Sequence, residues 1–91
     1  MKKTKTYNRI SDVLKTNRQW CKGNYHNDHG RYCLMGAISK VYPWSNDKRF
    51  NIDRKVNKYV RSLGYECPIN FNDAKSTTFK DIQKLMKKLG I

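Results

Sequence analysis

Acidic residues are scarce in this sequence: 7 Asp and Glu stand against 20 Lys and Arg among 91 residues, for a formal net charge of +13. With so few carboxylates the surface cannot balance its cations through ion pairs, so the chain attracts polyanions. The charge predicts nucleic acid, or a complex that contains nucleic acid, as the partner. An acidic protein surface is the alternative.

Long apolar runs are also missing, since no stretch approaches the ~20 apolar residues of a membrane span. The basic start of the chain continues into an amphipathic pattern, which argues against a secretory signal. The three cysteines, Cys21, Cys33 and Cys67, are too few and odd in number to pair fully within one chain. We therefore expect a reduced, cytoplasmic protein.

The length allows one hydrophobic core and is too short for two. The 2 Trp, 6 Tyr and 3 Phe residues argue against a disordered chain. We expect residues 1–6 to form a flexible basic arm and residues 7–91 to form a single helical domain.

Apolar residues recur with helical spacing in four segments, and no segment sustains strand alternation. The spacing predicts helices over residues 7–20, about 31–42, from beyond Asn46 to Gly64, and from Thr78 to Leu89, with a loop over 65–76. Thr78 and Asp81 resemble a capping box, and Gly64 and Gly90 suit helix ends. The predicted class is all-α with about four helices, and a short hairpin within residues 22–32 stays open.

Two of these helices carry rows of cations away from their apolar stripes. Such rows can contact successive phosphates, and each contact releases condensed counterions. The alternative is an ordinary solvated face, but such a face usually mixes both signs of charge. The predicted nucleic-acid-binding residues are Arg54, Lys55, Lys58 and Arg61 on the third helix, and Lys80, Lys84, Lys87 and Lys88 on the fourth.

Aromatic residues in polar loops are candidates for stacking on unpaired bases, and Tyr25 and Trp44 fit that description. Burial is the alternative, because a small domain needs its aromatics for the core. No helix-turn-helix, RNA-recognition or zinc-finger signature is present. The sequence therefore predicts phosphate contact with little direct reading of bases.

Two cysteines flank two histidines around the polar loop, in a C-x4-H-x2-H-x3-C pattern formed by Cys21, His26, His29 and Cys33. Two thiolates and two imidazoles can hold zinc tetrahedrally. The spacing is not a familiar zinc pattern, however, and Cys33 lies on an apolar helix face, as a buried small hydrophobe would. We expect no cofactor, with zinc as the alternative.

The same residues also offer a thiol nucleophile. Cys33 lies near the start of a predicted helix, whose dipole would lower the thiol pKa, and His26 or His29 would take the proton. No oxyanion-hole pattern accompanies them. We therefore expect a binding module rather than an enzyme.

Several short motifs occur in a familiar order: Trp20-Cys21-Lys22-Gly23, Asp28-His29-Gly30-Arg31, Cys33-Leu34-Met35-Gly36-Ala37-Ile38, Phe71-Asn72-Asp73 and Thr78-Phe79-Lys80-Asp81-Ile82. Over roughly residues 10–89 this order resembles the W-x-K-G, D-x-x-G, C-L-x-G-A-[IL], [WF]-N-D and T-x-x-[DE] motifs of an uncharacterised family, a domain of unknown function found in bacteriophage and bacterial genomes. The sequence departs from that pattern in a shorter Gly30–Cys33 segment and in Phe71, where Trp is typical.

The resemblance implies a small, mostly helical, phage-associated protein in the host cytosol, and it implies no activity. Host takeover, anti-defence, or inhibition of an acidic host protein would fit such an origin. Asp28, Arg31 and Asp73 are the candidates for a site shared by the family. The alternative for the two aspartates is helix capping and turn formation.

Overall fold

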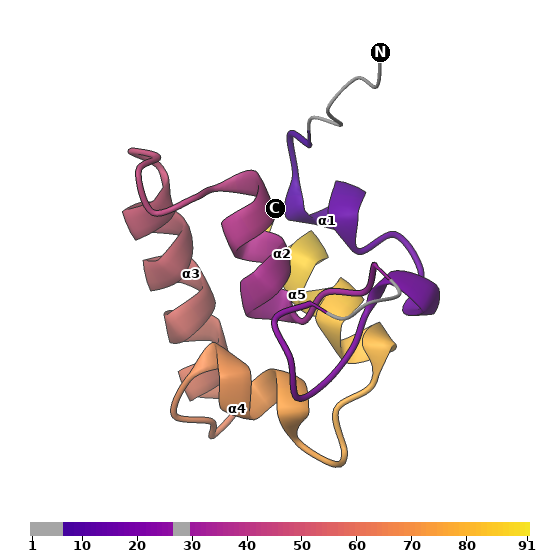
Figure 1. Cartoon of the computed structure of the whole chain (residues 1–91). Coiled ribbons are helices and arrows are strands. Elements are labelled where there is room, and N and C mark those ends of the chain that lie inside the picture. The colour runs from indigo at the N-terminus through magenta and orange to yellow at the C-terminus, as the bar shows by residue number, and fades with distance from the viewer. Residues whose placement is uncertain (1–6, 27–29) are drawn as a thin grey trace.

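The computed structural model describes residues 7–26 and 30–91. Its helices are α1 (Ile10–Val13), α2 (Leu34–Val41), α3 (Arg49–Ser62), α4 (Pro68–Asp73) and α5 (Phe79–Leu89), with a 3-10 turn, η1 (Asn17–Gln19), between the first two. Within those two ranges, β pairing is limited to isolated bridges of Tyr32 with Trp20 and with His26. The predicted all-α class is confirmed (Figure 1). The predicted basic arm, residues 1–6, lies outside the described residues.

The first predicted helix is wrong in length, because the chain leaves the α conformation after Val13. Thr16 then starts the separate turn η1: its Oγ1 accepts from the backbone N–H of Arg18 at 3.3 Å, and its own N–H donates to Gln19 Oε1 at 2.7 Å. A hydroxyl that bonds the local backbone competes with helix continuation. The apolar side chains at both ends of the segment are nevertheless buried, as the periodicity predicts.

The predicted loop over residues 65–76 contains a helix, α4. Pro68 occupies its first turn, where the missing proline N–H costs no hydrogen bond, and the Phe71 N–H donates to the Cys67 carbonyl at 3.1 Å. The six residues of α4 include few apolar side chains, so the segment is too short to show a helical periodicity in the sequence. Phe71 and Asn72 are both buried, so α4 ties the α3–α5 connection to the core.

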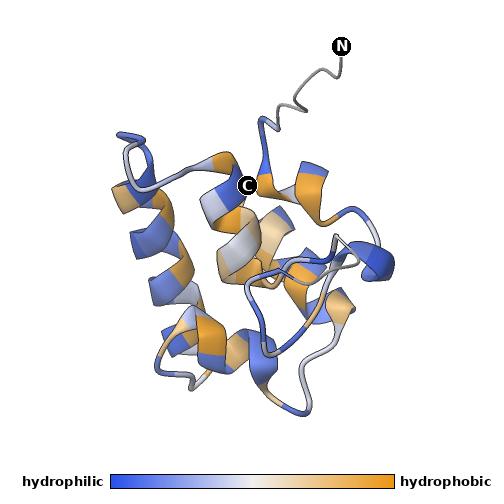
Figure 2. Ribbon diagram, in the orientation of Figure 1, coloured by the Kyte–Doolittle hydropathy of each residue, from blue (hydrophilic) through white to orange (hydrophobic). Residues whose placement is uncertain are grey.

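Helix α2 is central, with Leu34, Ala37 and Ile38 fully buried. Helices α1 and α4 pack on it, while α5 packs between α1 and α3. Figure 2 shows the hydrophobic stripes of α3 and α5 alternating with hydrophilic ones. A Cβ at Gly36 would collide with the backbone carbonyl of Tyr25, so a loop passes close against α2 at this position.

The helix ends follow the sequence prediction. Gly64 (φ 97°) and Gly90 (φ 68°) take the left-handed conformation, and the Tyr65 N–H closes α3 by donating to the Val60 carbonyl at 3.0 Å. Thr78 and Asp81 form the predicted capping box of α5. The longest helix, α3, has 14 residues. None of the described helices has the length and apolar character needed to cross a membrane.

Candidate nucleic-acid interface

The outer face of α5 carries the clearest concentration of free cations. Lys80, Lys84 and Lys87 are exposed and line one shallow hollow along the helix, opposite its buried stripe. Lys88 is exposed beside them. Among the described residues, no carboxylate lies within ion-pair distance of these ammonium groups. The face is therefore accessible to an external anion.

This cationic face continues onto α1. A groove of about 410 Å³ runs between α1 and the end of α5, with Arg9, Lys15 and Lys87 among its lining and buried Leu14 and Met86 beneath. Lys87 lines both this groove and the hollow on α5. The cations of α5 and α1 therefore form one continuous surface, which we call the α5–α1 face: Lys80, Lys84, Lys87, Arg9 and Lys15.

The predicted row on α3 is also exposed. Helical spacing places Arg54, Lys58 and Arg61 on the side of α3 opposite the buried stripe, and Lys55 is exposed next to them. At the pocket between α3 and α5, the lining residues on and just after α3 are instead Tyr59 and Leu63. The two predicted rows are therefore separated by an aromatic-lined pocket.

The few acidic side chains are largely committed to internal bonds. Four of the seven accept hydrogen bonds at 2.9–3.1 Å: Asp12 from the Arg9 N–H, Asp53 from Arg49 Nε, Asp73 from the Gly23 N–H and Asp81 from the Thr78 N–H. A carboxylate held in a cap or turn has less freedom to pair with a distant lysine. The positive field of the outer faces is left largely uncompensated.

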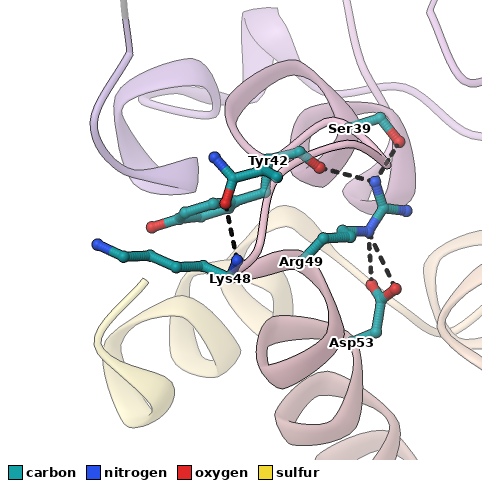
Figure 3. A network of polar contacts seen from close by, with 6 residues as sticks. Ser39, Tyr42, Lys48, Arg49 and Asp53 are labelled. Carbon is teal, nitrogen blue, oxygen red and sulfur yellow. Dashed lines mark hydrogen bonds and ion pairs between the residues drawn. The ribbon is translucent and has the colours of Figure 1, made fainter.

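Trp44, a predicted stacking residue, is 74% exposed, and its ring centroid lies 3.7 Å from the guanidinium carbon of Arg49. Arg49 is only 2% exposed and is held in a network (Figure 3): Nε donates to both carboxylate oxygens of Asp53, and Nη1 donates to Ser39 Oγ and the Tyr42 carbonyl. This cation–π contact fixes the indole from one side. The high exposure of the ring leaves surface available for a base.

Tyr25, the other stacking candidate, has an exposed side chain on a tightly held backbone. Its carbonyl accepts from the Cys33 N–H at 3.1 Å and contacts Gly36. The pocket that Tyr25 lines contains no residue of the α5–α1 face. Stacking by Tyr25 stays a prediction.

Cys33 is buried, at 4% exposed, and its sulfur accepts from the Gly36 N–H at 3.3 Å, so it caps α2. Burial raises the pKa of the Cys33 thiol, although hydrogen bonds from the Gly36 and Met35 backbone act in the opposite direction. The expected lowering of the pKa by the helix start is therefore outweighed. A protonated, buried thiol is a poor nucleophile.

The predicted zinc pattern is only partly described, because His29, like Asp28, lies outside the described residues. Among residues 7–26 and 30–91, no three Cys, His, Asp or Glu side chains gather as a metal site would require. His26 is exposed, with its ring 6.0 Å from that of Tyr32. Zinc binding by all four residues stays a prediction.

Residues from three of the quoted motifs meet around one buried amide. Asn72 Oδ1 accepts from Trp20 Nε1 at 2.6 Å and from the Leu34 N–H at 2.9 Å, while Asn72 Nδ2 donates to the Cys21 carbonyl at 3.0 Å and to Asp73 Oδ1 at 2.9 Å. These bonds use the Asn72 amide fully and fix three separate segments. The network joins α4, the start of α2 and the chain after η1.

Two further bonds reinforce this network. Asp73 Oδ1 accepts from the Gly23 N–H at 2.9 Å, and Lys22 Nζ donates to the Ala74 carbonyl at 2.6 Å. Burial raises the pKa of the Cys21 thiol, with the positive charge of Arg31 lowering it and Asp73 raising it. Arg31 and Asp73 therefore both lie near Cys21.

The comparisons with known proteins identify the family. A model of a family of unknown function, DUF6197, matches residues 2–89. The chain belongs to DUF6197. Neither the curated proteins nor the solved structures gave a match.

In this DUF6197 chain, most described motif residues hold the fold together. Asn72 and Asp73 bind the Trp20–Gly23 segment, Cys33 caps α2, and Gly36 accommodates a loop. The Asp73 carboxylate is held by the Gly23 N–H and by Asn72 Nδ2, and a site role for Asp73 stays a prediction. A binding role for Asp28 and Arg31 stays a prediction.

Sequence reasoning missed Arg9 and Lys15 on the candidate interface. Both flank the short apolar segment of α1, and neither belongs to a helical row. The excess of cations near the start of the chain could have indicated that Arg9 and Lys15 contribute to a basic surface. Their place beside Lys87 depends on the packing of α1 against α5, which the sequence pattern does not specify.

Proposed function

We propose that this protein binds nucleic acid through its backbone phosphates, with the α5–α1 face as the main contact surface. The observation that carries the proposal is the continuity of exposed Lys80, Lys84 and Lys87 with Arg9 and Lys15. The described residues provide these α5 lysines with no carboxylate partner. Neutralising phosphates would release counterions, so affinity should depend steeply on salt.

The α3 row and Trp44 provide a second contact surface. Arg54, Lys58 and Arg61 are exposed along α3, and Trp44 lies in the loop that leads into that helix. Phosphate contacts by these cations would add affinity, and an exposed indole is suited to stacking on an unpaired base. On these two surfaces the mechanism is charge neutralisation, which by itself carries little base selectivity.

The family resemblance supports a phage-associated role in a host cytosol, with host nucleic acid or a host complex containing it as the partner. An acidic host protein would meet the same cations. A Cys33 enzyme is not proposed, because burial raises the pKa of that thiol. The proposal also requires no zinc.

The test is binding to duplex DNA, single-stranded DNA and RNA across a salt series, together with capture from host lysate before and after nuclease treatment. Binding that falls steeply with salt, and capture that nuclease abolishes, support the proposal. Absence of binding at low salt overturns it. If the protein still captures an acidic host protein after nuclease treatment, the partner of the α5–α1 face is that protein and not nucleic acid.

A further inference from the structure

A pocket of about 280 Å³ lies between α3 and α5, at the boundary between the two cationic surfaces. Tyr59 lines it from α3, Leu63, Tyr65 and Phe71 line it from the segment that follows, and Asp81 and Lys84 line it from α5. Leu63 is 51% exposed, although it is a large apolar residue. The pocket thus combines apolar walls with an anion and a cation.

The aromatic wall of this pocket is held in place before any ligand arrives. The rings of Tyr65 and Phe71 meet edge to face, with centroids 5.3 Å apart and planes at 64°. The Tyr65 backbone is fixed by its bond to Val60, and Phe71 is buried. A preformed aromatic surface loses little side-chain entropy when a planar group stacks on it.

The polar residues of the pocket complement a nucleotide. Asp81 Oδ2 accepts from the Thr78 N–H and hydroxyl at 2.9 and 3.2 Å, whereas Asp81 Oδ1 has no hydrogen-bond partner among the described residues. A carboxylate oxygen accepts from the exocyclic amino group of cytosine or adenine. The exposed Lys84, which also belongs to the α5–α1 face, suits the phosphate attached to that base.

We infer that this pocket takes one unpaired base of a single-stranded nucleic acid, with preference for a base that carries an exocyclic amino group. The inference rests on the proposed function, since the phosphates of the strand would follow the α5–α1 face. In a duplex, the bases are stacked and paired, so entry would require flipping one out of the helix. The protein should therefore favour single strands over duplexes.

The first experiment compares strands that differ only in their bases. An oligodeoxycytidylate of roughly 12 nucleotides and an abasic strand with the same number of phosphates are titrated with the full chain at one salt concentration. We expect the abasic strand to bind roughly tenfold more weakly, with oligodeoxythymidylate in between. Equal affinity for all three overturns the base pocket and leaves phosphate binding intact, whereas no binding to any strand overturns both proposals.

The second experiment locates the effect. Leu63→Asn changes a half-exposed wall of the pocket without altering charge, and Tyr59→Leu replaces the ring with a smaller side chain that is still apolar. Phe50→Leu is the matched control, because Phe50 is an exposed aromatic on α3 that does not line this pocket. The two pocket variants should lose the preference for cytidine over abasic strands, and the control should keep it. A preference that survives in folded Leu63→Asn and Tyr59→Leu contradicts the assignment; thermal melts establish folding.

Discussion

The side-chain oxygen of Asn72 accepts a hydrogen bond from the indole Nε1 of Trp20 at 2.6 Å, across 52 positions of sequence. The same oxygen accepts from the Leu34 N–H at the start of α2. One fully buried amide thus links the first half of the chain to α4. Three of the motifs in the family resemblance, those that contain Trp20, Leu34 and Asn72, meet at this point, which gives them a role in folding.

Replacing Asn72 with Ala should lower the free energy of unfolding by about 3 kcal/mol, because several buried polar groups would lose their partner at a typical cost of 1–3 kcal/mol each. Chemical denaturation measures this. Asn70→Ala is the control, since Asn70 is exposed on the same helix and should change stability by less than about 0.5 kcal/mol. Similar stability for the two variants would contradict the role of the network.

Gly36→Ala should destabilise the protein by about 2 kcal/mol, because its Cβ would collide with the rigid backbone carbonyl of Tyr25. Helix propensity alone predicts the opposite sign, a gain of up to about 1 kcal/mol. Comparing Gly36→Ala with Lys40→Ala, at an exposed position of α2, isolates the collision. A Gly36 variant more stable than wild type would show that the Tyr25 loop does not pack as described.

Trp44 should report on single-stranded binding through its fluorescence. Its exposed indole is fixed over Arg49, whereas the other tryptophan, Trp20, is buried. Stacking on a base should quench the emission with single-stranded DNA, and Trp44→Phe should abolish the change. If the quenching persists in Trp44→Phe, Trp44 is not the stacking residue.

Cys33 should react slowly with iodoacetamide at pH 8, because burial raises its pKa and keeps the thiol protonated. The sign for stability follows: the contribution of the neutral thiol is present below the unfolded-state pKa and is lost as pH rises through the higher folded-state pKa. Mass spectrometry of labelled peptides should find Cys67, which is half-buried, modified before Cys33. Rapid labelling of Cys33 in the folded protein would revive a nucleophilic role.

The sequence predicted what periodicity and capping encode. The stripes of α3 and α5, the Thr78–Asp81 capping box and the glycine ends of both helices were all predicted correctly, because each depends on residues within about one or two turns. Helix α4 was missed, because its formation depends on burying Phe71 and Asn72 against distant segments.

The candidate site was predicted less completely than the fold. The cations of α5 are exposed, as their spacing predicts. The residues of other elements that lie beside them cannot be predicted from the local sequence. Packing of α1 places Arg9 and Lys15 beside Lys87, and packing of α3 places Tyr59 between the two predicted rows. The pKa of Cys33 shows the same limit. Its position near a helix start, which favours a low pKa, can be read from the sequence, but the burial that raises the pKa depends on tertiary structure.

The central claim is that the α5–α1 face contacts phosphates, and two double variants of equal charge test it most directly. Lys80→Gln with Lys87→Gln removes two cations from the face, and Lys40→Gln with Lys75→Gln removes two exposed cations elsewhere. Binding to single-stranded DNA is measured for both across a salt series. For the first variant, the slope of log K against log salt should fall in magnitude by roughly 1.4. For the control, the slope should stay at the wild-type value, and only the overall affinity should fall because the net positive charge is lower. Equal slopes for the two variants would contradict the claim.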